Sequence, residues 1–235
     1  MNKNQNRLPL IMAAMGGVLL VLRLLLYTVA VDEKNLLVSG HFLLVVIWAL
    51  GAVCLALAVF AALKTAERSR MAVTSPAAAV GDGALALAIG ISLAWMRPVS
   101  LLEMATMAFG GMAVLCLGYG AYCRARGKQV FFGCFCVVCV YLALHLVGSY
   151  RAWSSNPQLQ DYVFSMLACV AMTMFAYQNA ALDVGIGSRR MWVASGLTAV
   201  CFGIAAVCGG NAKVMYFAGA VWALTTLLGR ERVKK

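Results

Sequence analysis

Charged residues are scarce in this sequence: Asp, Glu, Lys and Arg together make up 11% of its 235 residues. Soluble globular domains contain about 25%. Hydrophobic residues make up 63%, and the mean hydropathy is +0.88. This composition excludes a water-soluble globule, a disordered chain and a basic domain that binds nucleic acid. It indicates an all-α integral membrane protein that is surrounded mainly by the lipid bilayer.

Long loops and catalytic motifs are also lacking. The longest connection between apolar runs is the segment 64–76, so there is little room for a catalytic or ligand-binding domain outside the membrane. The sequence contains no phosphate-binding lysine loop, no Gly-x-Ser-x-Gly and no His-Glu-x-x-His. No two carboxylates stand on adjacent turns of an apolar run. These absences give no support to an enzyme, and we expect one polytopic transmembrane domain over residues 1–235.

Histidines are few, and no cysteine lies in the middle of a loop. All nine cysteines fall within or at the ends of apolar runs, so we expect free thiols that act as small apolar residues. The pattern Cys134-x-Cys136-x-x-Cys139 resembles a Cu(I) ligand set, but Cys134 points away from the helical face of the other two. His41 and His145 are the only histidines, and no second pair exists to hold a haem. We therefore expect no metal and no cofactor.

What the sequence has in abundance is apolar runs of about 20 residues, the length that crosses a bilayer core as a helix. Charged and turn-forming residues divide these runs into eight candidate spans. The spans are 8–31, 41–63, 77–96, 101–123, 129–149, 162–182, 191–208 and 212–229. They predict a bundle of eight transmembrane helices in four antiparallel hairpins. The last two spans are the weakest, because 191–208 is short and 212–229 reaches a useful length only by including Lys213.

The basic residues test this count. If the N-terminus is cytoplasmic, the cytoplasmic segments hold fourteen Lys and Arg residues, the external ones hold four, and Arg23 lies within the membrane. Every second connection is therefore basic, which is the pattern of the positive-inside rule. We expect both termini to be cytoplasmic, in a plasma membrane, and the minimal loops suit a bacterial protein. The net charge of +11 then reflects membrane topology and needs no nucleic-acid partner.

Two charged residues, Arg23 and Glu103, are candidates for a pair in the outer half of the predicted bundle. Arg23 lies inside the first span, where an ionisable side chain is costly and often functional. Glu103 lies in the first turn of the fourth span, on a face of small residues that favours helix contact. We predict an ion pair between them. The alternatives are that Arg23 extends to lipid headgroups and that Glu103 complements the helix dipole.

His145 and Asp82 are the other intramembrane polar candidates. His145 lies near the outer end of its span, one turn from Tyr141, and is a candidate for a proton relay or for the polar lining of a cavity. Asp82 lies between Gly81 and Gly83 near the inner end of the third span. The glycines are compatible with the opened backbone of a transporter helix. The alternative is an aspartate of the N-terminal turn that lies within reach of the membrane interface and pairs with a cytoplasmic arginine.

Two function classes follow from these features. One is a small permease or channel-like transporter with a polar lining toward the outer leaflet, whose partner is a small solute. The other is an accessory subunit or scaffold that binds another membrane protein laterally. Convergence of Arg23, Glu103 and His145 on one cavity would favour transport, and scattered positions would favour a scaffold.

Overall fold

A computed structural model describes residues 7–29, 41–65, 75–154, 162–208 and 212–229 of the chain. These residues form eight α-helices and one short 3-10 helix, and no β-strand occurs among them. The helices are α1 (Leu8–Val29), α2 (Phe42–Leu63), α3 (Pro76–Ala94), α4 (Leu101–Ala125), α5 (Phe132–Trp153), α6 (Val163–Val184), α7 (Arg189–Ala205), η3 (Ala206–Cys208) and α8 (Lys213–Leu228).

Each predicted span corresponds to one helix, so the predicted all-helical architecture is confirmed. Residues 30 and 31, the predicted end of the first span, lie outside the described part of the chain. Seven helices are long and apolar enough to cross a membrane, counting α7 together with η3. The exception is α8, whose 16 residues extend about 24 Å at 1.5 Å per residue. The described residues therefore have the architecture of a multi-pass membrane protein, with seven helices long enough to span and one shorter apolar helix.

Local sequence explains where several helices begin and end. Ser75 accepts a hydrogen bond from the backbone N–H of Ala78 and is followed by proline at the first position of α3. Ser100 and Glu103 form a capping box at the start of α4. At the C-terminal end of α6, Gly185 has a φ of +87°, the left-handed conformation that glycine adopts without a steric penalty.

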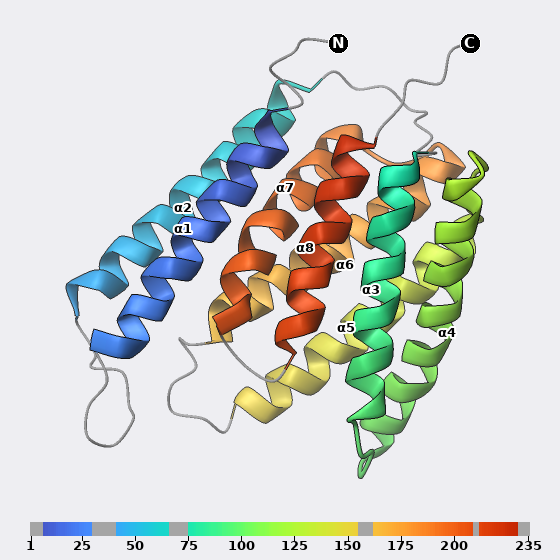
Figure 1. The fold of residues 1–235 in the computed structure, drawn as a ribbon, viewed down its shortest axis with the longest axis horizontal. Coiled ribbons are helices and arrows are strands. Elements are labelled where there is room, and N and C mark those ends of the chain that lie inside the picture. Colours follow the sequence, from blue (N-terminus) through green and yellow to red (C-terminus); the bar gives the residue numbers. More distant parts are fainter. Residues whose placement is uncertain (1–6, 30–40, 66–74, 155–161, 209–211, 230–235) are drawn as a thin grey trace.

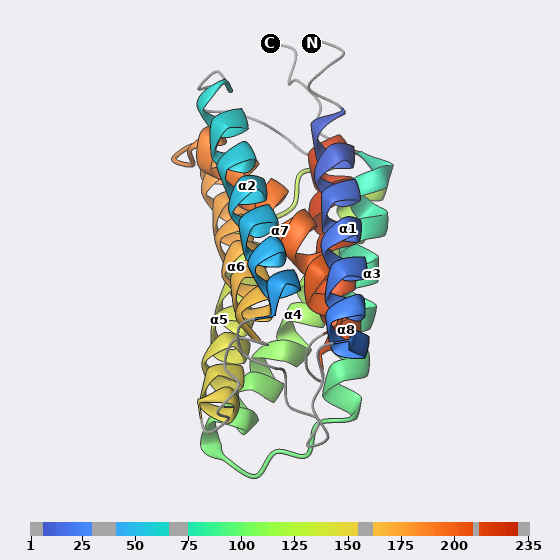
Figure 2. The same ribbon diagram turned by 90° about the vertical axis from the view of Figure 1, so that its left-hand side faces the viewer.

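Helices α3 to α8 form a closed ring in which each helix packs on the next and α8 packs on α3. The hairpin of α1 and α2 packs on α7 at the outside of this ring (Figures 1 and 2). In α6 and in α7 with η3, 61% of the 18-residue apolar segment is buried inside the protein, whereas only 22% of the corresponding segment is buried in α2 and α4. Large apolar side chains such as Leu87, Leu115 and Phe60 are exposed on the outer surface, where lipid would surround them.

The two ends of the bundle differ in charge. Helices α1, α3, α5 and α7 begin at the end where α2, α4, α6 and α8 finish (Figure 1). We call this the basic end, because the described residues there include seven cations: Arg7, Lys64, Arg124, Arg126, Lys128, Arg189 and Arg190. The opposite end, which we call the far end, carries Arg97, Arg151 and Lys213 among its described residues. The described cations are therefore concentrated at the end of the bundle where the sequence predicts them for eight spans.

Candidate functional site

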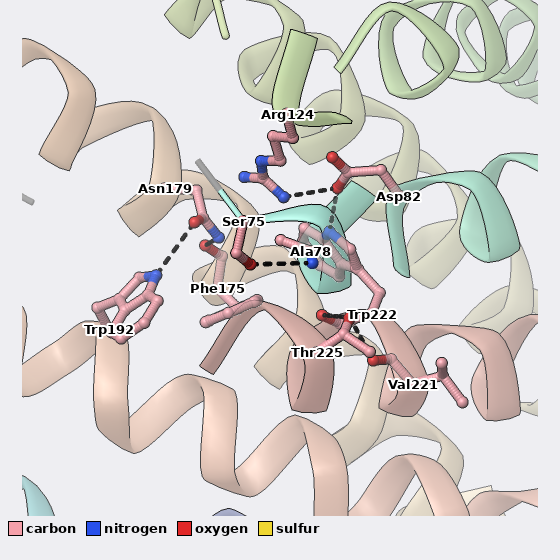
Figure 3. Close-up of polar contacts among 10 residues, drawn as sticks. All are labelled: Ser75, Ala78, Asp82, Arg124, Phe175, Asn179, Trp192, Val221, Trp222 and Thr225. Carbon is pink, nitrogen blue, oxygen red and sulfur yellow. Dashed lines mark hydrogen bonds and ion pairs between the residues drawn. The ribbon is translucent and has the colours of Figure 1, made fainter. Parts of the chain in front are cut away.

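A buried ion pair joins three helices near the basic end. Asp82 lies in the second turn of α3 and is fully buried, and Arg124 lies in the last turn of α4 and is 2% exposed. Arg124 Nη1 donates to Asp82 Oδ1 at 2.8 Å, and Trp222 Nε1 of α8 donates to the same oxygen at 2.8 Å (Figure 3). We call Asp82, Arg124 and Trp222 the inner tie.

Two glycines make room for the inner tie. A Cβ atom at Gly81 would collide with Thr225 Oγ1 and would lie 3.0 Å from the Trp222 Cα atom. The absence of a side chain at Gly81 therefore lets α3 approach α8 closely enough for the indole to reach Asp82. A Cβ atom at Gly120 of α4 would lie 3.3 Å from Asp82 Oδ2, so this glycine leaves space for the carboxylate.

The inner tie is incompletely satisfied. Asp82 Oδ2 and Arg124 Nε are buried and have no hydrogen-bond partner in the structure. The Phe135 ring covers the guanidinium, whose central carbon lies 4.9 Å from the ring centroid. A buried charge without its partner is costly, so each member of the pair depends strongly on the other.

A water-sized cavity lies beside Arg124. It has a volume of about 10 Å³ and is lined by seven residues, and this is about the space that one buried water needs. The lining consists of Arg124, Gln129, Val130, Asn179, Leu182, Asp183 and Trp192. Trp192 Nε1 donates to Asn179 Oδ1 at 3.1 Å, which fixes one wall (Figure 3). Asp183 is exposed, and the positive charge of Arg124 acts on its carboxylate.

A much larger cavity lies at the far end of the ring. Its volume is about 730 Å³, and α3, α4, α5 and α8 supply most of its walls. The side chains with polar atoms in its lining are Ser92, Trp95, Thr106, Tyr141, His145, Ser149 and Tyr162. No Asp, Glu, Lys or Arg of the described residues lines it. We call it the far-end cavity.

Hydrogen bonds and ring contacts hold the polar lining in place. The His145 Nε2 atom and the Ser149 hydroxyl lie 3.5 Å apart, one turn from each other on α5. The Tyr141 hydroxyl donates to Met215 Sδ of α8 at 3.6 Å. The Thr106 hydroxyl donates to the Leu102 carbonyl at 2.8 Å, as a helical threonine commonly does. The cavity therefore presents an imidazole, hydroxyls and aromatic rings among apolar walls.

A layer of buried apolar side chains separates the far-end cavity from the inner tie. On α3, Ala88 lines the cavity and lies six residues from Asp82, about 9 Å along the helix axis. The side chains at the same level, including Leu85 of α3, Leu117 of α4 and Val138 of α5, are at most 1% exposed. The ring is thus hollow at one end and closed at the other.

The predicted ion pair between Arg23 and Glu103 is wrong. Arg23 is buried, and its Nη1 donates to the Ala205 carbonyl at 2.6 Å, where α7 gives way to η3. The guanidinium also lies over the Phe164 ring, 5.0 Å from its centroid. Glu103 Oε2 accepts hydrogen bonds from the backbone N–H groups of Val99 and Ser100 at 2.7 and 3.0 Å. Helix α1 packs on α7, whereas α4 packs on α3 and α5, so the two side chains belong to different parts of the bundle.

The structure scatters the four sequence candidates. His145 lines the far-end cavity, Asp82 lies in the inner tie, and neither Arg23 nor Glu103 lines either cavity. For Asp82, the sequence offered a cytoplasmic arginine as an alternative partner without naming Arg124, which it counted as a connection residue; it missed Trp222. The available signal was the position of Trp222 in the middle of an apolar run, away from the interface where tryptophan is usual. A tryptophan there needs a partner for its indole N–H.

The cysteine thiols form no disulfide or metal site among the described residues, and His41 caps a helix. All nine cysteines are free thiols in the structure. Among the described residues, no group of three or more His, Cys, Asp or Glu side chains is placed to hold a metal ion. His41 precedes α2, and its Nδ1 accepts the backbone N–H of Leu43 at 3.3 Å, which caps the helix.

Comparison of the chain with models of protein families, with curated proteins and with solved structures found no match. The functional interpretation therefore depends on the geometry of this chain.

Proposed function

We propose that this multi-pass membrane protein is a small permease that takes up a solute through the far-end cavity. The observation that carries the proposal is a cavity of about 730 Å³ that ends at a layer of buried apolar side chains. On the other side of this layer, the inner tie joins α3, α4 and α8. A site accessible from one side and closed on the other is what alternating access requires of one conformation.

The orientation follows from the charges. The described cations are concentrated at the basic end, and the positive-inside rule assigns that end to the cytoplasm. Both termini are then cytoplasmic, the far-end cavity faces outward, and the inner tie closes the cytoplasmic side. A plasma membrane is the location that this arrangement fits.

The lining favours an uncharged solute. Hydroxyl groups and one imidazole supply hydrogen bonds, whereas none of the described lining residues carries a fixed charge that would pair with an ionic solute. The volume falls within the range of about 300–1,000 Å³ that is usual for small-molecule sites. We therefore expect a small neutral molecule that combines hydrogen-bonding groups with an apolar part.

A second candidate function is an accessory subunit that binds another membrane protein. Two observations favour it: Arg23, Glu103 and His145 do not share a cavity, and an apolar groove of about 680 Å³ runs between α3 and α4 on the outside of the ring. Gly90 and Gly118 line this groove, and a Cβ atom at either position would meet open space. Small residues on a helix surface permit close approach of another helix.

Solute flux into proteoliposomes tests the permease. Urea, glycerol and nicotinamide serve as neutral probes of different size. We expect at least one to enter faster than into protein-free vesicles. Thr106→Trp, which fills the cavity, should abolish the difference. The matched control is Leu115→Trp on the lipid-facing side of the same helix, where the side chain is 74% exposed, and it should leave the flux unchanged. Equal entry of all three probes with and without the protein would overturn the permease and favour the accessory subunit.

A further inference from the structure

Arg124 is close to two carboxylates of different accessibility. Its Nη1 contacts Asp82 Oδ1, which is completely buried. Its charge also acts on Asp183 of α6, which is exposed at the basic end and lines the same water-sized cavity as Arg124. Both acids are close enough to interact with the same guanidinium, but the direct ion pair is made with the buried one.

The free oxygen of Asp82 lies near one wall of the water-sized cavity. Asp82 Oδ2 has no hydrogen-bond partner. Both this oxygen and Val130 Cγ1 lie within 4 Å of the position that a Cβ atom of Gly120 would occupy. Val130 lines the cavity together with Arg124 and Asp183, whereas Asp82 is not part of the lining. The cavity therefore brings the exposed carboxylate to the guanidinium that pairs with the buried one.

From this juxtaposition we propose that Asp82 is a proton-binding site reached from the basic end, and that its protonation transfers Arg124 from Asp82 to Asp183. The biological role of the site rests on the permease proposed above, for which the proton would be the coupling ion. Loss of the Asp82–Arg124 bond would separate α3 from α4 at the end that is closed in this structure.

The step balances without a further reactant. A hydronium ion from the aqueous phase at the basic end gives its proton to Asp82 Oδ2 and leaves as water. A new O–H bond forms, and the carboxylate becomes a neutral carboxylic acid. Arg124 keeps its charge, because a guanidinium does not lose a proton in proteins. Its remaining anionic neighbour is Asp183, while Trp222 Nε1 continues to donate to Asp82 Oδ1.

Among the described residues, few charged groups surround Asp82. The two helices that pack on α3 are α4 and α8. Helix α4 faces the carboxylate with Arg124. Helix α8 presents the Trp222 indole and, one turn on, the Thr225 hydroxyl, and neither is charged (Figure 3). Asp183 of α6 acts on Arg124 across the cavity. The charge of Arg124 is therefore shared by one buried and one exposed acid.

Infrared difference spectroscopy of the full-length protein in lipid vesicles, between pH 8 and pH 5, tests the proton site. We expect a reversible carboxylic-acid carbonyl band in the wild type that is missing from Asp82→Asn and retained in Asp183→Asn. Asp82→Glu should retain the band at a shifted frequency, which assigns it to position 82 even if Asp82→Asn fails to fold. An identical band in the wild type, Asp82→Asn and Asp82→Glu, or no band in the wild type, would overturn the proposal.

Thiol labelling at constant pH tests the movement of Arg124. Val130→Cys places a thiol on the wall of the cavity, where the native side chain is 7% exposed. A maleimide applied from the basic end should modify it several-fold faster when Asp82→Asn, the mimic of the protonated acid, is also present. Asp183→Asn, which removes the second partner instead, should give no such increase. Equal rates in all three backgrounds would exclude the transfer.

These experiments use no solute. If the infrared band is present but no probe solute crosses the membrane, the permease fails and the proton site stands. If solute flux is measured and the band is absent, the permease stands and the proton site fails.

Discussion

At the scale of single residues, two arginines inside the bundle bond to groups on other helices. Arg124 reaches a carboxylate 42 positions earlier in the chain, and Arg23 reaches a carbonyl 182 positions later. In both cases the guanidinium donates to an oxygen acceptor in the buried interior. Such bonds cost stability when one partner alone is removed.

The inner tie gives the first prediction at this scale. Arg124→Leu and Asp82→Leu should each lower the free energy of unfolding by about 3–5 kcal/mol, because each leaves an uncompensated buried charge. The double substitution should recover much of the loss. Thermal unfolding of the detergent-purified proteins measures all three. The control is Arg126→Leu, an exposed neighbour that lies over the Tyr122 ring and should have little effect. Simple addition of the two single effects would show that the residues do not act as a pair.

Arg23 and Glu103 give the second prediction at the scale of single residues. Arg23→Leu removes the bond to the Ala205 carbonyl and should lower the free energy of unfolding by about 1–3 kcal/mol. Glu103→Leu removes one half of the capping box of α4 and should have a smaller effect. Because the two residues lie on helices that do not pack on each other, their effects should add within about 0.5 kcal/mol. A marked recovery of thermal stability in the double variant would contradict the structure.

At the scale of helices, close approach of α3 and α8 depends on one glycine. Gly81→Ala should lower the free energy of unfolding by about 1–3 kcal/mol, because the new methyl group meets Thr225 and the backbone at Trp222. Gly83 lies two residues on, where a Cβ atom would meet open space. Gly83→Ala should therefore be neutral or stabilising, by up to about 1 kcal/mol. Thermal unfolding compares the two variants directly, and equal losses would contradict the packing of α3 on α8.

Helix positions were largely predictable, because each depends on a local pattern. Long apolar runs locate the helices, and residues such as Ser100 and Gly185 mark their ends. The short α8 was one of the two least certain spans, and there is a physical reason. Nine of its 16 residues are buried in the bundle, so its surroundings are largely protein, and its length need not match the bilayer.

At the scale of the whole molecule, the proposed orientation can be measured by thiol labelling of intact cells and inverted vesicles. Lys128→Cys at the basic end should react with a membrane-impermeant maleimide only from the cytoplasmic side, because positive connections stay inside. Val99→Cys at the far end, where the side chain is 90% exposed, should react only from outside. The unsubstituted protein, with its nine native thiols, sets the background. Labelling of Lys128→Cys from outside would reverse the proposed orientation.

The sequence by itself determined the class of protein, the helices and the alternation of charge between the two ends, since these depend on composition and on patterns within about 25 residues. Only the tertiary structure decided which polar residues meet. Arg23 and Glu103 have matching depths in the sequence reading, but depth gives no lateral position in a bundle. The neighbours of a helix depend on packing between residues far apart in the chain. For that reason Asp82 meets Arg124 and Trp222, and His145 lines a cavity that neither Arg23 nor Glu103 lines.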